Sequence, residues 1–262
     1  MRVTLLGCGT SSGVPRVGGI DGRGDWGSCD PAEPRNRRRR VALLIEAADT
    51  TVLIDTGPDL RAQLLDAGVR RLDAVLYTHD HADHVHGIDD LRQVFHNQRR
   101  PVDCYADAAT WEVLRRRFDY VFEGRGGYPA TCTAHDLPER LTIGPLVIRH
   151  FRQPHGDIES LGFRIDGEGA SVVYSTDIKL LPAAAHPMLE ALDLWIVDAL
   201  RRAPHPSHSH LEQTLGWIAR VQPRRALLTH MDNTMDYREL VASLPTGVEP
   251  GYDGQSIDFA QA

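Results

Sequence analysis

The strongest constraint on this chain is a cluster of histidines in its first third. Of its 13 histidines, four fall within eight residues, at His79, His81, His84 and His86. The run His79-Asp80-His81-Ala82-Asp83-His84 directly follows the apolar segment 73–78, which predicts a buried strand. A loop after a strand can present imidazole and carboxylate groups to two sides, and these ligands suit Zn²⁺, Mn²⁺ or Fe²⁺. The run therefore predicts a metal site rather than a solvated turn.

Three further candidates come at or shortly after strand-like segments. His155 comes three residues after the segment 146–152, Asp177 follows 172–175, and His230 follows 226–229. Strand ends are rigid and the loops beyond them are accessible, so side chains placed there can converge on one site. Taken singly, each histidine would more often be an ordinary partly buried one. Together with the cluster they complete a predicted set of metal ligands: His79, His81, Asp83, His84, His155, Asp177 and His230.

The pattern of strands and helices predicts an α+β fold. Strand-like segments outnumber helical ones and form two groups separated by helices, which indicates two packed sheets with helices outside, in one domain over residues 1–262. The expected strands are 2–6, 40–46, 51–55, 73–78, 102–105, 146–152, 161–165, 171–175, 194–197 and 226–229. The expected helices are 59–67, 85–95, 108–118, 211–220 and 237–244. The segment 123–138 is expected to be rich in loops.

Composition restricts the partners and the compartment. The net charge of −7 gives no bulk attraction to nucleic acid, and no apolar stretch is long enough to span a bilayer. The four cysteines, Cys8, Cys29, Cys104 and Cys132, form no CxxC pair and no regular disulfide spacing. Free thiols favour a reducing cytosol, so we expect a cytoplasmic protein with no membrane partner. The sequence leaves open whether the chain forms a homodimer.

The HxHxDH run with a later His, Asp and His resembles the metallo-β-lactamase superfamily. The resemblance implies an αββα sandwich, in which two packed mixed β-sheets are flanked by helices, and a dinuclear site for two divalent ions, zinc or manganese. It implies that one ion is held by His79, His81 and His155, and the other by Asp83, His84 and His230. Asp177 and a hydroxide would bridge them. The superfamily hydrolyses several classes of bond, so the fold alone does not fix the substrate.

Shorter segments resemble one branch of the superfamily, the PhnP group of cyclic phosphodiesterases, which is similar to tRNA 3′-processing endonucleases. The matching segments are Gly-Thr-Ser-Ser-Gly-Val-Pro at 9–15, Ser-Leu-Gly-Phe at 160–163, Tyr-Ser-Thr-Asp at 174–177, Leu-Thr-His at 228–230 and Gly-Tyr-Asp-Gly at 251–254. The resemblance implies a small phosphodiester substrate, a cyclic phosphate or a nucleotide. The bridging hydroxide would attack phosphorus in line.

A histidine in the segment 205–211 is expected to act as the general acid. His208 aligns best with the residue that has this role in the branch, and the departing alkoxide needs a proton that the metals do not supply. His208 and Asp83 are therefore the catalytic candidates. Alternatively, His208 and His210 could be polar caps of the helix that starts near residue 211. The roles of His210 and His86 stay open.

The chain departs from the PhnP group in its N-terminal loop. The group has a cysteine cluster there that binds a structural zinc with a later histidine, whereas this loop has only Cys29 and the partner position is Asn233. We therefore expect no structural zinc, and an ordered loop held by Trp26 and the neighbouring arginines. The run Arg35–Arg40 could bind phosphate or RNA, but charge runs are more often solvated faces, and its role stays open.

Two other functions compete with the phosphodiesterase. An RNA 3′-end endonuclease ranks lower because the chain has no long basic insertion to serve as a tRNA-binding arm, and nucleic acid is not an expected partner. A β-lactamase ranks lower still. A non-catalytic, metal-binding accessory protein belongs to a different class, and the complete set of seven candidate ligands argues against it.

Overall fold

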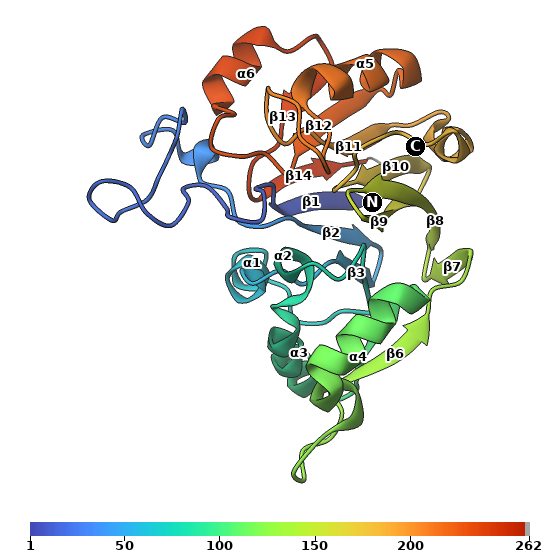
Figure 1. Cartoon of the computed structure of the whole chain (residues 1–262). Coiled ribbons are helices and arrows are strands. Elements are labelled where there is room, and N and C mark those ends of the chain that lie inside the picture. Colours follow the sequence, from blue (N-terminus) through green and yellow to red (C-terminus); the bar gives the residue numbers. More distant parts are fainter. Residues whose placement is uncertain (260–262) are drawn as a thin grey trace.

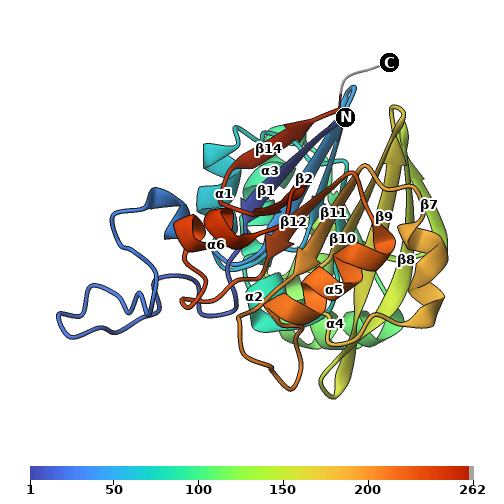
Figure 2. The ribbon, with the colours of Figure 1, turned by 90° about the horizontal axis from the view of Figure 1, so that it is seen from above.

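Two seven-stranded sheets form the centre of the computed structural model, which describes residues 1–259 (Figures 1 and 2). In spatial order, the first sheet contains β14 (Gln255–Asp258), β1 (Arg2–Gly7), β2 (Ala42–Ala47), β3 (Thr50–Ile54), β4 (Ala74–Leu76), β5 (Val102–Ala106) and β6 (Cys132–Asp136). The second contains β13 (Val248–Pro250), β12 (Arg225–Thr229), β11 (Leu194–Asp198), β10 (Ala170–Ser175), β9 (Ile158–Gly167), β8 (Leu146–His155) and β7 (Arg140–Ile143). Both sheets mix parallel and antiparallel pairs.

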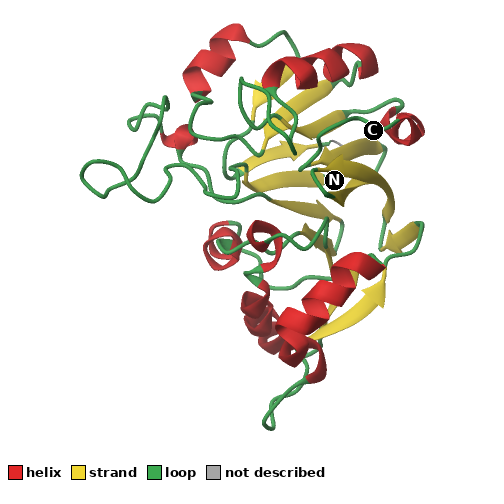
Figure 3. Ribbon diagram, viewed as in Figure 1, coloured by secondary structure: helices red, strands yellow, loops and turns green. Residues whose placement is uncertain are grey.

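Helices cover the outer face of each sheet (Figures 1 and 3). Those on the first sheet are α1 (Leu60–Asp66), α2 (Ala82–Val85), α3 (Leu91–Gln98) and α4 (Ala108–Glu123). Those on the second are α5 (Leu211–Val221) and α6 (Tyr237–Ser243). Short 3₁₀ helices occur at Pro34–Asn36, Ile88–Asp90 and Ala183–Leu189. This arrangement confirms the expected αββα sandwich of two mixed sheets flanked by helices.

The alternation of side chains along a strand explains why the layers form. In β2, Leu43 and Ile45 point into the core between the two sheets, whereas Ala42 and Leu44 point to the core beneath the helices of the first sheet. Successive residues of a strand face opposite sides, so a strand that is apolar at every position must be covered on both faces. Burying each large aliphatic side chain stabilises the fold by about 1.5–3 kcal/mol.

The predicted helix over 85–95 is wrong as a single element. The chain instead forms α2, a 3₁₀ turn at Ile88–Asp90, and α3. The break lies at Gly87, whose N–H donates to the carbonyl of Thr56 at 2.7 Å. A Cβ at position 87 would lie 2.0 Å from the carbonyl oxygen of Gly57, so only glycine allows this close approach. The contact holds α2 against the end of β3.

Other differences concern short or extended strands. β6 and β7 lie within and just after the segment expected to be loop-rich, and β13 and β14 follow the last predicted element. β8 continues to His155 rather than ending at Arg152, because it pairs with β9 along its whole length. None of the helices in the described part of the chain is long and apolar enough to cross a lipid bilayer.

Candidate metal centre

The candidate ligands meet where several strands of both sheets end. β4 leads to His79, β8 ends at His155, β10 leads to Asp177 and β12 leads to His230. Asp177 and His230 have left-handed backbone conformations, with φ of 54° and 57°. This conformation is uncommon outside glycine and is typical of sites where the surrounding structure imposes it. The turns therefore direct these side chains back over the strand ends.

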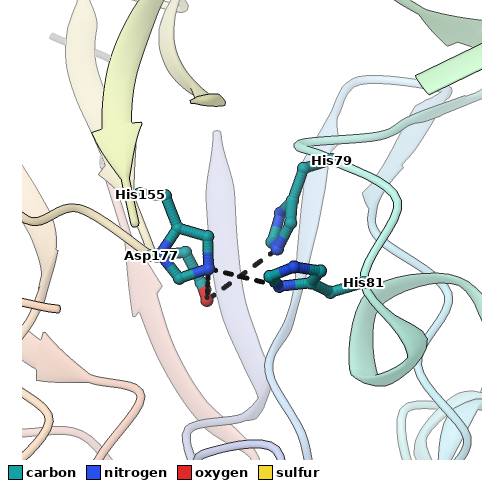
Figure 4. Close-up of side chains that lie close together, drawn as sticks. All are labelled: His79, His81, His155 and Asp177. Atoms are coloured by element: carbon teal, nitrogen blue, oxygen red, sulfur yellow. Dashed lines mark hydrogen bonds and ion pairs between the residues drawn. The ribbon is translucent and has the colours of Figure 1, made fainter. Parts of the chain in front are cut away.

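One group of side chains combines His79, His81, His155 and Asp177, with one ligand atom from each within 4.8 Å of the others. Figure 4 shows the four side chains pointing toward a common centre from separate elements. His155 Nδ1 lies 2.9 Å from the carbonyl oxygen of Ser207. A carbonyl only accepts, so Nδ1 carries the proton and Nε2 presents its lone pair to the centre. This group contains the three histidines predicted for the first ion.

A second group combines Asp83, His84 and His230, again with ligand atoms within 4.8 Å of one another. Asp83 and His84 are adjacent on α2, a single turn that directly follows His81. His84 Nε2 lies 3.5 Å from Asp83 Oδ2, and His230 Nε2 lies 3.6 Å from the same oxygen. This group is the set predicted for the second ion.

Asp177 lies between the two groups. Its Oδ1 is 3.4 Å from His155 Nε2 in the first group and 3.4 Å from His230 Nε2 in the second. Its Oδ2 is 3.2 Å from His84 Nε2 and accepts a 2.6 Å hydrogen bond from Thr176. A carboxylate placed between two sets of imidazoles can be shared by two cations, as predicted for Asp177.

Three of the nitrogens that face this centre lack hydrogen-bond partners, whereas His155 Nε2 and His81 Nδ1 lie 3.2 Å apart and pair with each other. Within residues 1–259, Nε2 of His79, His84 and His230 completes no hydrogen bond, although each is buried. A buried polar atom without a partner costs about 1–3 kcal/mol, so a native structure rarely leaves three together. A cation in each of the two groups would give all three nitrogens a partner. The buried His/Asp groups are therefore consistent with a dinuclear metal site.

The pKa values of the site also favour cation binding. Burial lowers the pKa of His79 well below its ordinary value, so its imidazole is neutral. Burial lowers the pKa of His230 as well, but Asp177 and Asp83 outweigh it and raise the pKa to about 9. Burial raises the pKa of Asp177, but His230 and His84 outweigh it and hold this pKa well below its ordinary range. The carboxylate is thus ionised, and a cation would replace the proton on His230 as its partner.

His208 lies at the edge of this centre. Its Nε2 is 3.9 Å from Asp177 Oδ1, and it belongs to a third possible ligand group with Asp177 and His230. Its Nδ1 is 2.8 Å from Oδ2 of Asp198, a fully buried carboxylate at the end of β11. His208 is therefore held by a side chain within the site rather than serving as a helix cap. The sequence reading missed Asp198, although it ends an apolar strand as the other candidates do.

A second carboxylate that the sequence reading missed supports His84. Asp55 Oδ2 lies 2.7 Å from His84 Nδ1, and the same carboxylate accepts hydrogen bonds from the backbone N–H and hydroxyl of Thr78. Asp55 follows β3 directly and has a left-handed φ of 65°. A carboxylate behind a ligand histidine fixes the orientation of the ring and raises its basicity.

Two histidines of undecided role lie outside these groups. His86 is exposed, and its ring packs edge-on against Phe118 of α4 at 5.7 Å between centroids. His210 occupies the N-cap position of α5, but its side chain makes no capping hydrogen bond. Neither residue belongs to a ligand group found within residues 1–259.

The run Arg35–Arg40 is only partly a solvated face, because one of its arginines is buried. Arg38 is 1% exposed, and its guanidinium donates to the carbonyl oxygens of Asp232 and Met235 at 3.2 and 2.6 Å. It also contacts Cys29 Sγ at 3.7 Å. Arg37 lies over the ring of Trp26 at 5.1 Å. These contacts tie the loop between β1 and β2, which projects from the side of the molecule in Figures 1 and 2, to the segment after His230.

Comparisons with known proteins agree with this geometry. Residues 50–231, more than half of the chain, match the family described as Beta-lactamase superfamily domain. The chain is similar to the crystal structure of "a New Diphosphatase from the PhnP Family", with 32% identity, a TM-score of 0.89, and coverage of 99% of this chain and 98% of that one.

Two curated relatives are longer than this chain. An octanoyltransferase from Porphyromonas gingivalis is 36% identical over 97% of this chain and 51% of its own length. A ribonuclease Z from Bradyrhizobium is 32% identical over 50% of this chain and 45% of its own length. The chain thus spans about half the length of these curated relatives. From the family match and the end-to-end similarity in structure, we conclude that the chain belongs to the metallo-β-lactamase superfamily, within its PhnP-like branch.

Proposed function

We propose that this protein is a dinuclear metal-dependent phosphodiesterase that hydrolyses a small or cyclic phosphodiester. The observation that carries the proposal is the position of Asp177, whose carboxylate lies within 3.4 Å of histidines from both ligand groups, with the His208–Asp198 pair at their edge. Two cations held there would supply an activated water and would neutralise the phosphoryl oxygens. We propose His79, His81 and His155 for one cation, Asp83, His84 and His230 for the other, and Asp177 for both, with zinc or manganese as the metal.

His208 is the proposed general acid. Asp198 accepts the Nδ1 proton of His208 and so orients the ring; as general acid, His208 would carry a second proton on Nε2. Nε2 points toward Asp177 and can deliver that proton to the leaving oxygen, which an alkoxide requires. Asp198 is itself held by the backbone N–H of Ile178 at 3.2 Å. Asp198 is thus a positioning residue, because it acts through His208.

The comparisons support phosphorus chemistry. A solved relative that aligns along the whole chain is named a diphosphatase, and other relatives are named ribonuclease Z, so both names concern bonds to phosphorus. The octanoyltransferase name belongs to a protein about twice as long, and acyl transfer by this chain is not part of the proposal.

An RNA 3′-end endonuclease is the second candidate, because several relatives are ribonucleases Z. The net charge of −7 weighs against a polyanionic substrate. Cleavage of a precursor tRNA separates the two candidates. A non-catalytic accessory protein would cleave neither class of substrate.

Purified protein loaded with Mn²⁺ or Zn²⁺ should hydrolyse bis(p-nitrophenyl) phosphate and a 2′,3′-cyclic nucleotide faster than a precursor tRNA or a lactone. Inactivity on every phosphodiester with both metals would reject the proposal. Preferential cleavage of the tRNA would favour the endonuclease instead.

The role of His208 has its own test. His208→Ala should lower kcat by about 10²-fold on a dialkyl phosphodiester while the metal content is unchanged. The loss should be much smaller on the p-nitrophenyl ester, because p-nitrophenolate leaves without a proton. Asp198→Asn should show the same dependence on the leaving group. Equal losses on both substrates, or none, would remove His208 from the mechanism.

A further inference from the structure

A groove of about 490 Å³ begins at the candidate ligand His79. It runs between the N-terminal end of α4 and the hairpin that joins β8 to β9. Four carboxylates and one arginine contribute to its wall: Asp80, Asp107, Asp157, Glu159 and Arg152. Since His79 is both a candidate ligand and part of its wall, the groove borders the metal centre, and a group attached to a phosphate bound there can extend toward it.

The positive charges at this groove are already paired. Arg152 lies between two carboxylates, with Nη2 3.1 Å from Asp107 and Nη1 3.1 Å from Glu159. Asp80 pairs with Arg117 of α4 at 3.4 Å. Asp157 has no ion pair with any residue from 1 to 259. Four carboxylates against two guanidinium groups leave a net charge of −2.

The N-terminus of α4 does not make the groove attractive to anions. The N-terminus of a helix attracts anions through its free N–H groups. In α4, however, the carboxylate of Asp107 already accepts the N–H of Thr110 at 2.9 Å. An incoming phosphate would have to displace this cap and approach the excess carboxylates. The groove is therefore poorly suited to a second anionic group.

We propose that this groove receives the substituent of the phosphodiester that does not react, and selects one that donates hydrogen bonds and carries no negative charge. A polyol or an amine has this chemistry, whereas a further phosphate or a polynucleotide strand does not. The inference rests on the proposed phosphodiesterase function. Asp157 and Glu159 are the specificity-determining residues, since Asp157 is unpaired and Glu159 is half-exposed at the rim.

Three p-nitrophenyl esters with one leaving group test the proposal. They are p-nitrophenyl phosphorylcholine, the p-nitrophenyl ester of thymidine 5′-phosphate, and the same thymidine ester with an added 3′-phosphate. At low salt, kcat/KM for either of the first two should exceed that for the third by about fivefold, from two unit charges roughly 8 Å away in water. The ratio should approach one in the double variant Asp157→Asn, Glu159→Gln, and in about 1 M salt.

The single variant Asp157→Asn should lower the ratio part of the way, and Asp49→Asn is its matched control. Asp49 lies in the turn between β2 and β3, at the opposite end of the sheet from the metal centre, and is exposed. It changes the net charge by the same amount and should leave the ratio unaltered. A 3′-phosphorylated ester that is cleaved as fast as the others, or a ratio unchanged in the double variant, would overturn the groove proposal alone. Hydrolysis of none of the three would overturn the proposed function, and the groove proposal with it.

Discussion

The metal centre and the cluster around Arg38 are both buried and polar, but their polar groups are paired in different ways. The metal centre gathers imidazoles and carboxylates, and Nε2 of His79, His84 and His230 lacks a partner within residues 1–259, so bound cations would satisfy these nitrogens. The cluster around Arg38 carries its own cation, and the guanidinium donates to carbonyl oxygens from the segment after His230. The difference between the two clusters shows that a metal site is indicated by buried nitrogens without partners, and not by buried polar residues alone.

The Arg38 cluster occupies the region where the PhnP resemblance placed a structural zinc. Cys29 contacts the guanidinium of Arg38, and Asn233, at the position of the missing histidine, donates to Asp25 Oδ2 at 3.2 Å. Each side chain that remains from the expected zinc site thus has a protein partner. The expectation of no structural zinc stays a prediction, to be tested by metal analysis.

The largest effect that separates the two clusters should come from Asp177→Asn. An amide cannot supply a negative charge to two cations, and the lost stabilisation of several kcal/mol corresponds to an activity loss of about 10³-fold. Metal content should fall in parallel, while the contribution of Trp26 in the N-terminal loop to the fluorescence, taken as the difference from a Trp26→Phe protein, should stay as in the parent protein. Full metal content in this variant would contradict the shared role of Asp177.

Arg38→Met should affect the other cluster. It leaves two backbone carbonyls without donors, and we expect the free energy of unfolding to fall by about 3 kcal/mol in a denaturant titration. Two metal ions should remain bound. Arg37→Met is the matched control, because Arg37 is exposed over Trp26 and should cost less than about 1 kcal/mol. Equal losses in both variants would show that burial of Arg38 is not what holds the loop.

Asp55→Asn should have an intermediate effect on the metal centre. The hydrogen bond to His84 Nδ1 orients that ring, and loss of such a partner typically weakens metal affinity by about 10–100-fold. Competition with a chelator would measure the affinity, and excess metal should restore activity. An affinity equal to that of the parent protein would mean that α2 alone fixes His84.

Acidification should empty the metal centre before it releases the loop. Imidazole ligands must be neutral to bind a metal, so protons displace the ions as the pH falls. In the loop, hydrogen bonds from Arg35 and then Arg238 lower the pKa of Glu33 to about 2, against the opposing effect of burial. A depressed carboxyl pKa contributes stability that is complete above about pH 4.5 and is lost as the pH falls through about 2.

The difference between the pH of metal release and the pH of loop release is the smallest of the expected effects. Metal release and the contribution of Trp26 to the fluorescence, taken as the difference from a Trp26→Phe protein, should change at separate pH values in an acid titration, with metal released first. Simultaneous changes would show that the loop depends on the metals.

Local pattern predicted the two packed sheets and the seven candidate ligands, whereas the division of these ligands into two groups came from the resemblance to the superfamily. The seven candidates lie at or near the ends of apolar strands, and strand ends meet at one edge of a sheet. The same criterion would have found Asp55 and Asp198, which follow β3 and end β11; they were missed because an isolated aspartate lacks the signal of a histidine cluster. Arg38 could not be predicted, because its burial depends on carbonyl groups about 200 residues away in the chain.

The most direct test is the titration of metal into chelator-stripped protein while the hydrolysis of bis(p-nitrophenyl) phosphate is followed. If two ions share Asp177 and the Arg38 cluster needs none, activity should rise to a plateau at two equivalents of Mn²⁺ or Zn²⁺ per chain. A plateau at one or at three equivalents, or no hydrolysis at any ratio, would contradict the account.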